Sequence, residues 1–396
     1  MSLKNADRLG RTNKLLLICI YLALPISLPA QEMPPTKKTT ATETVQRPES
    51  ESNSKAKSDF RSKVERLLSS DDETQAANAE SELIKEEKQK AKLEAKAAAN
   101  VTADGRTRFL HLRTKKGEPK SLDTAIVTYR AATENGVTVD LLGAVHIGEA
   151  SYYKKLNCLF DEYDVLLYEL VAPEGTRIPK GGKREGQGFN PVGALQGGMQ
   201  KMLGLELQLE QVDYTKEHFV RADMTPSQMG KKMAERGETP FSLALDTFSD
   251  LMKQQNKIME DPKAAEELLG FDPEDISLSD MFSNPLKMKR MMASQFAKTG
   301  SLDQGLGRSL NQLLIVDRNA VALQGLQKQI AAGKKKIGIF YGAAHLPDFE
   351  KHLVEDLGLK KTNHRWLAAW DLNTATKPKL DKTTELLLNV LKFLED

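Results

Sequence analysis

Two segments that lie far apart in the sequence share one local design, and they constrain the fold more than any other feature. Each is a short apolar strand followed by Gly-x-x-His and then by a predicted helix, over residues 141–146 and 340–345. In an open α/β sheet, ligands bind at the carboxyl ends of the strands, where a glycine lets the backbone turn sharply and approach a ligand. The repeated design therefore predicts an α/β fold with His146 and His345 at one edge of a sheet.

A third apolar strand, predicted over residues 165–169, ends in an acid, Glu169. Its nearly continuous apolar run is typical of a parallel strand that is buried on both faces. A carboxylate there is costly to bury unless it is paired or bound to a metal. Two imidazoles and one carboxylate can hold Zn, Mn, Co or Fe and leave positions open for water and substrate. We therefore expect His146, Glu169 and His345 to bind a divalent metal ion, although strand-end histidines also occur as hydrogen-bonded structural residues.

The elements around these motifs predict a mixed α/β (α+β) fold, with a central mixed β-sheet, βαβ units and flanking helices. Asn135-Gly136 is a strong hairpin signal, so the first strands should pair antiparallel. Apolar residues at helical spacing over 150–163 predict the crossover helix of a right-handed βαβ unit. A long amphipathic helix should end before Gly333, its C′ residue. The expected strands are 109–112, 125–129, 137–142, 165–169, 336–341 and 364–372, and the long helix is 303–332.

Residues of about 205–300 predict a mainly helical, Met-rich insertion, with a cluster at Met281, Met288, Met291 and Met292. Such a stripe is typical of a pliable core, and a cap over a substrate groove is the alternative. Cys158, in a predicted helix, is expected to be a small core residue. The remaining histidines lack the strand-end context and are expected to be structural or at the surface: His111, His218, His352 and His364.

The ends of the chain differ in composition from its middle. Residues 1–30 combine a basic start with an apolar run, which predicts a signal peptide or a signal anchor that tethers the chain to a membrane. Residues 31–60 predict a disordered linker, 61–100 a charged helical arm, and 376–396 a C-terminal amphipathic helix. The net charge of +2 and the absence of a clustered basic face argue against nucleic-acid binding.

The motifs, taken in order, resemble the TraB/TIKI superfamily. That group includes bacterial TraB/GumN-type proteins and animal TIKI proteases, and it is distantly related to the erythromycin-esterase (EreA) and ChaN-like fold. The resemblance covers residues 107–372 and is specific only as an ordered set. It is carried by Gly143-Ala-Val-His146-Ile-Gly148, Tyr152-Tyr153, the strand that ends at Glu169, the segment 205–224, Asp317-Arg318-Asn319 and Gly342-Ala-Ala-His345.

The resemblance implies roles for individual residues. His146, Glu169 and His345 would be metal ligands or catalytic groups, beside the glycines of their motifs, Gly143 and Gly342. Arg318 would be catalytic or would order the site, and a structural pair with Glu169 or Asp223 is an equal alternative. Asp223 is either a further acid of the site or the N-cap of the helix that starts at Thr225-Pro226, and the cap is favoured.

The resemblance implies an exported metal-dependent hydrolase, residing in the periplasm, outside the cell or on a membrane facing outward. A metal-activated water would attack a peptide or a small ester. Peptidase activity is implied only for the animal branch. Two alternatives stay open: a non-catalytic protein that sequesters a peptide, as the TraB-type branch implies, and a metal-free esterase based on histidine.

Overall fold

A computed structural model describes residues 100–102, 105–133, 136–182, 200–243, 284–299 and 308–374, with a few positions between 245 and 253. The sheet and the site belong to the unit that includes Arg108–Asp396. The segments predicted over 1–30, 31–60 and 376–396, and nearly all of 61–100, lie outside the described residues. In the described part of the chain, no helix is long and apolar enough to cross a membrane.

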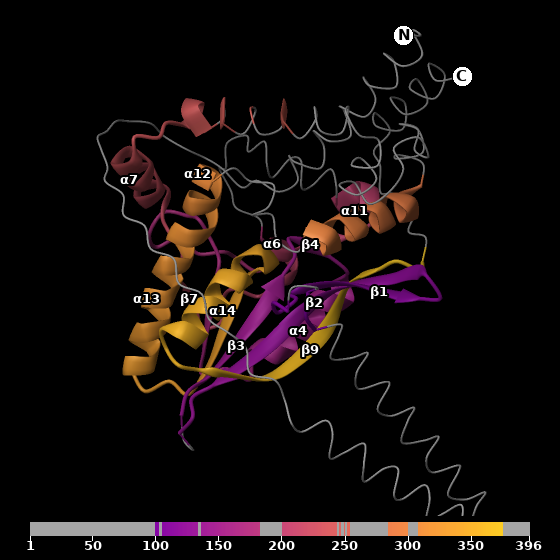
Figure 1. The fold of residues 1–396 in the computed structure, drawn as a ribbon. Coiled ribbons are helices and arrows are strands. Elements are labelled where there is room, and N and C mark those ends of the chain that lie inside the picture. The colour runs from indigo at the N-terminus through magenta and orange to yellow at the C-terminus, as the bar shows by residue number, and fades with distance from the viewer. Residues whose placement is uncertain are drawn as a thin grey trace, which may run out of the picture. The chain divides into compact units, whose positions relative to one another are not determined.

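The centre of the fold is a seven-stranded mixed sheet in the order β1-β2-β3-β8-β5-β7, with β9 also paired to β2 (Figure 1). The pairs among β1, β2, β3 and β9 are antiparallel, whereas β3, β8, β5 and β7 run parallel. This arrangement confirms the mixed α/β fold. The strands are β1 (Leu110–Lys115), β2 (Glu118–Arg130), β3 (Thr138–Ala144), β5 (Val165–Tyr168), β7 (Phe219–Arg221), β8 (Lys336–Gly342) and β9 (Lys360–Asp371), and a separate pair is β4 (Ile147–Gly148) with β6 (Glu206–Leu207).

The parallel strands bring the two Gly-x-x-His motifs together. β8 lies between β3 and β5, with Ala144 opposite Gly342 and Tyr168 opposite Phe340. All four residues of β5 and most of β8 are buried, as the continuous apolar runs predicted. Because carboxyl ends of parallel strands meet at one edge, the residues that follow β3, β5 and β8 share that edge.

Two helical layers cover the sheet. Side chains alternate between its faces, so Leu142, Leu166 and Phe340 belong to one core cluster and Leu141, Leu167 and Ile339 to another. Helices α4 and α11 pack in the first cluster, and α13 and α14 pack in the second (Figure 1). The helices are α4 (Ala150–Phe160), α6 (Gln208–Gln211), α7 (Pro226–Arg236), α11 (Pro285–Thr299), α12 (Arg308–Asn311), α13 (Asp317–Ala331) and α14 (Leu346–Glu355).

The described residues of the segment 205–300 include short strands as well as helices. The segment contributes β7, an edge strand parallel to β5, which no periodic pattern announces because it has only three residues. Met288, Met291 and Met292 of α11 are buried in the core beside α4, so they fill the core as the first interpretation expected. Met281 lies outside the described residues.

The long helix predicted over 303–332 is interrupted. A π-helical turn, Gln312–Val316, separates α12 from α13, and residues 303–307 lie outside the described part. The predicted end is confirmed: Gly333 has φ +84°, and the N–H groups of Gly333 and Lys334 donate to Ile330 O and Gln329 O at 2.9 and 3.1 Å. This bond pattern is the Schellman motif. Extra turns of the π type often mark functional positions, and this one directly precedes Arg318 and Asn319.

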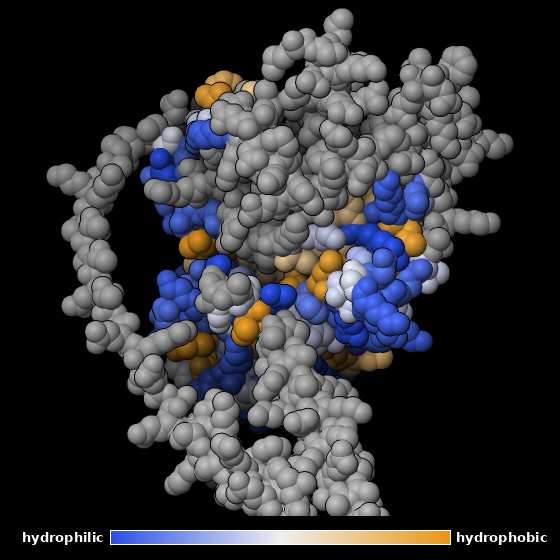
Figure 2. All heavy atoms as spheres, turned by 45° about the vertical axis from the view of Figure 1, so that its right-hand side comes forward, coloured by the Kyte–Doolittle hydropathy of each residue, from blue (hydrophilic) through white to orange (hydrophobic). Residues whose placement is uncertain are grey.

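The predicted hairpin is partly confirmed. β2 and β3 pair antiparallel, but Arg130 opposes Thr138, so residues 131–137 form a longer loop than a two-residue turn. Asn135 itself is outside the described residues. On the face that Figure 2 shows, the coloured surface is mainly hydrophilic with separate apolar patches. A mixed surface of this kind is normal for a folded chain.

Candidate functional site

Three strand ends supply the core of the site. Glu169 directly follows β5, His345 lies in a short 3₁₀ turn (Ala343–His345) after β8, and His146 lies two residues beyond β3. Glu169 Oε1 is 3.6 Å from His345 Nε2, and both side chains are nearly buried, at 9% and 5% exposure. His146 is exposed, yet its charge is among the causes that lower the pKa of Glu169. The exposed imidazole of His146 therefore acts electrostatically on the buried carboxylate of Glu169.

Arg318 is the hub of the buried cluster. Its Nε and Nη2 donate to Asp223 Oδ1 and Oδ2 at 2.9 and 2.7 Å, and Nη2 also donates to Glu169 Oε1 at 2.7 Å. Nη1 donates to Leu314 O at 3.3 Å and points to His345 Nε2 at 3.5 Å. All five N–H groups of the guanidinium are thereby directed at protein acceptors. Arg318 consequently orders the site and has no free donor for a substrate.

Glu169 is held as a carboxylate. Burial by itself would raise its pKa, but the charges of Arg318 and His345 outweigh burial and hold the pKa well below its usual value. Glu169 Oε2 also accepts the Gly342 N–H at 2.7 Å. A side chain at Gly342 would place its Cβ 3.2 Å from that same oxygen. A side chain at position 342 would therefore push against the Glu169 carboxylate, which glycine leaves in place.

The second motif glycine has a different neighbourhood. A Cβ at Gly143 would meet Ala125 O at 3.2 Å and Leu346 Cδ1 at 3.3 Å, so this glycine permits tight packing of β3 against β2 and α14. The turn after it is fixed by two buried tyrosines. Tyr152 Oη donates to Gly143 O and Tyr153 Oη to Val145 O, each at 2.9 Å. Both tyrosines are core residues, as expected, and they fix the backbone that carries His146.

Asp223 is an acid of the site, and the favoured N-cap interpretation is wrong. Its side chain is fully buried against Arg318. The N-cap of α7 is Thr225, whose hydroxyl accepts from Gln228 N while the Gln228 side chain accepts from Thr225 N. A residue immediately before Pro226 has the extended backbone of a cap, whereas Asp223 lies two residues too early to reach the first turn.

Two further residues, Asn319 and Asp348, contact the site and were not predicted from the sequence. Asn319, next to Arg318, contacts His345 through its side chain: His345 Nδ1 lies 2.7 Å from Asn319 Oδ1. Asn319 Nδ2 in turn donates to His345 O at 3.0 Å and to Asp348 Oδ2 at 2.9 Å. Asn319 is part of the Asp-Arg-Asn element of the sequence, which was the only signal for it.

The side chains of His345, Glu169 and His146 are of the types that bind divalent metals, and the distance between two of them also fits such a metal. Nε2 of His345 and Oε1 of Glu169 are separated by 3.6 Å, and ligand atoms of one tetrahedral zinc lie about 3.4 Å apart at metal–ligand distances of about 2.1 Å. Within the hydrogen-bonded cluster two carboxylates face one guanidinium. As the described side chains stand, however, no three His, Cys, Asp or Glu residues are grouped to hold a metal ion. His146 would complete the set by turning its imidazole inward.

The other histidines are structural or exposed, as expected. His218 Nε2 lies 2.9 Å from Phe160 O, and His352 contacts the carboxylates of Asp348 and Asp356, each four residues away. His111 and His364 both pack against Trp366, with ring centroids 5.2 and 4.7 Å away.

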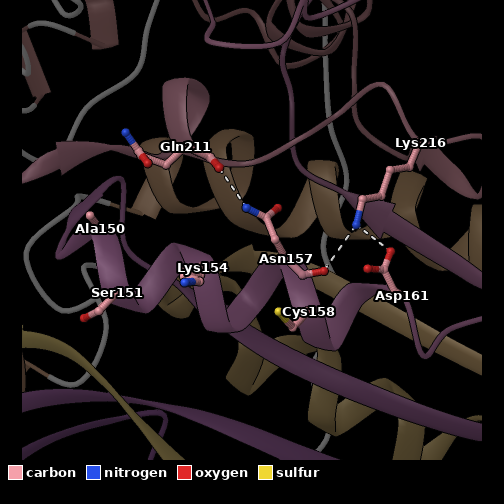
Figure 3. Close-up of a pocket in the computed structure, with 8 residues that line it drawn as sticks. All are labelled: Ala150, Ser151, Lys154, Asn157, Cys158, Asp161, Gln211 and Lys216. Atoms are coloured by element: carbon pink, nitrogen blue, oxygen red, sulfur yellow. Dashed lines mark hydrogen bonds and ion pairs between the residues drawn. The ribbon is translucent and has the colours of Figure 1, made fainter.

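A surface pocket of about 510 Å³ lies elsewhere, along the outer face of α4 (Figure 3). None of its lining residues belongs to the cluster around Arg318. Cys158 lines this pocket and is exposed, so the expectation of a core residue is wrong. Cys158 points away from the core residues Leu156 and Leu159 of α4. It lies on the outer side of the helix, where Lys154 and Asp161 also lie (Figure 3).

Comparison with protein-family models, with curated proteins and with solved structures gave no match to this chain.

Proposed function

We propose that the protein is an exported hydrolase of the TraB/TIKI type, which uses a divalent metal to cleave peptide or small ester bonds. The observation that carries the proposal is the contact between two strand-end groups, His345 Nε2 and Glu169 Oε1, which lie 3.6 Å apart. The exposed His146 acts on Glu169 through its charge. Export is proposed from the basic and apolar composition of residues 1–30.

Charge supports a cation at this position. The hydrogen-bonded cluster contains the buried carboxylates of Glu169 and Asp223 but only the guanidinium of Arg318. Arg221 lies nearby, but it donates to the backbone oxygens of Leu170, Ala172 and Asp223 and to neither carboxylate. Two buried carboxylates share one guanidinium, so a bound cation that neutralises part of this negative charge would stabilise the cluster while His345 is neutral.

Each residue has a defined task in this proposal. His345, Glu169 and, after a side-chain rotation, His146 would hold the metal. A bound divalent ion supplies a more acidic water and polarises a substrate carbonyl. Arg318 keeps Glu169 ionised and in place, and Asp223 anchors Arg318 from the other side. His146, as the exposed group, is where a substrate would first approach.

A metal-free hydrolase is the second candidate, because Arg318 already occupies one side of Glu169 and no three donors are grouped in the described side chains. His345 Nε2 would then act as the base, and the exposed His146 would bind the substrate.

The test is hydrolysis of a peptide and ester collection by the full chain, before and after chelation and after metal is added back. The proposal expects turnover that chelation removes and metal restores, and that His345→Ala abolishes. His218→Gln is the matched control, since His218 only bonds a backbone carbonyl, and it should retain activity. Turnover unaffected by chelation would favour the metal-free candidate, and binding of peptides without any product would contradict both.

A further inference from the structure

The side chain of Asn319 has only one orientation that satisfies its neighbours. Its Nδ2 faces two oxygens that only accept, His345 O at 3.0 Å and Asp348 Oδ2 at 2.9 Å. A flipped amide would set its oxygen against both acceptors. Asn319 is fully buried, so water cannot substitute for either bond. The Oδ1 atom must therefore face His345.

This orientation determines which ring nitrogen of His345 carries the hydrogen. Asn319 Oδ1 is an acceptor, and it lies 2.7 Å from His345 Nδ1. Two lone pairs at that distance would repel, so Nδ1 carries the hydrogen and donates it. In a neutral imidazole the other nitrogen, Nε2, then has the free lone pair. That nitrogen faces Glu169 Oε1 and the N–H of Arg318 Nη1.

We propose that Asn319, backed by Asp348, is a positioning residue that fixes His345 in the Nδ1–H form and so makes Nε2 the working nitrogen of the site. Arg318 and Asn319 are consecutive on α13, directly after the π turn, so one helix aims one residue at the acids and the next at the histidine. Outer contacts of this kind orient metal-binding histidines. The inference rests on the proposed function only for the use that is made of Nε2.

The direct test is ring-nitrogen NMR of the metal-stripped full chain with labelled histidine, at about pH 9, where imidazoles are neutral. His345 is assigned from His345→Ala. His218 is an internal reference for the opposite form, because its Nε2 must donate to Phe160 O. The wild type should show His345 protonated at Nδ1, and Asn319→Ala should lose that preference.

Protonation of His345 at Nε2 in the wild type would overturn the proposal, and so would an unchanged form in folded Asn319→Ala. If the alanine variant does not fold, the tautomer of the wild type tests the proposal by itself.

Zinc titration of the same proteins separates the two proposals. Asn319→Ala should weaken zinc binding about 10- to 100-fold, and the control His218→Gln should not. If the wild type has the predicted form but binds no zinc, the positioning role stands and the metal function fails. If zinc binds while Asn319→Ala leaves the imidazole unchanged, only the positioning role fails.

Discussion

Replacing Arg318 by methionine tests the buried cluster, because it removes the cation that contacts both Glu169 and Asp223. The Asp223 side chain is fully buried and Glu169 is 9% exposed, and Arg318 donates twice to the first and once to the second. Removing one partner of a buried ion pair costs about 3–5 kcal/mol, since the remaining charge has no compensation. We expect Arg318→Met to lose about that much free energy of unfolding at pH 8.

The loss should depend on pH. Without Arg318, burial should raise the pKa of the Glu169 carboxyl in the folded state above the unfolded value. The folded variant then binds more protons than its unfolded chain, so its stability rises as pH falls. The difference from wild type should therefore shrink toward pH 5. Adding Asp223→Asn to Arg318→Met removes one of the two buried charges that have lost their partner. The double variant should therefore regain part of the free energy of unfolding at pH 8.

The assay is urea denaturation followed by tryptophan fluorescence, since Trp370 is buried in β9. Arg290→Met is the matched control: Arg290 pairs with Glu118 at 3.2 Å, and those side chains are 32% and 62% exposed. Such a surface pair contributes about 0–1 kcal/mol. A loss for Arg318→Met no larger than the control, or one that does not change with pH, would refute the argument.

Two further predictions follow from single side chains. Burial, and then the charges of Lys361 and His111, lower the pKa of His364 to about 4 from 6.5, so the unfolded chain takes up this proton first and stability is lost as pH falls from about 6.5 to 4. The full shift corresponds to about 3 kcal/mol, which partial exposure reduces to about 1–2 kcal/mol. In His364→Phe, the free energy of unfolding measured with urea should change less with pH over this range. An unchanged pH dependence in this variant would contradict the prediction. Gly342→Ala places a Cβ 3.2 Å from Glu169 Oε2 and should cost about 1–3 kcal/mol of stability in thermal unfolding. Gly325→Ala is the control, because its Cβ meets only an ordinary contact at 3.4 Å, and it should not lose this stability. Equal effects of the two substitutions would contradict a tight contact between position 342 and Glu169.

The sequence predicted the strands that carry the site because their signals are local. Apolar runs, the Gly-x-x-His endings and the acid at Glu169 each occupy a few consecutive residues. The parallel order β3-β8-β5, which makes those endings neighbours, agrees with the expectation of one shared edge. Gly333 was identifiable for the same reason, since a helix end needs only one residue of left-handed backbone.

What the sequence could not show depends on contacts between distant segments. The bonds from Asn319 to His345 and Asp348 span 26 and 29 residues, and nothing in the local pattern marks Asn319 as their source. Asp223 was assigned to a helix start because Thr225-Pro226 is a local signal, while Arg318, its actual partner, is 95 residues away. β7 was missed because three residues carry no period, and its place follows only from pairing with β5.

Metal content is the most direct measurement of the central claim. The full chain, purified without a histidine tag and loaded with Mn, Co, Zn or Fe, is analysed by elemental mass spectrometry beside His146→Ala, His345→Ala and the control His218→Gln. The account predicts close to one bound ion per chain in the wild type and the control, and its loss from both folded alanine variants. No bound metal in the wild type after loading, or an ion retained by both alanine variants, would contradict a metal site at His146, Glu169 and His345.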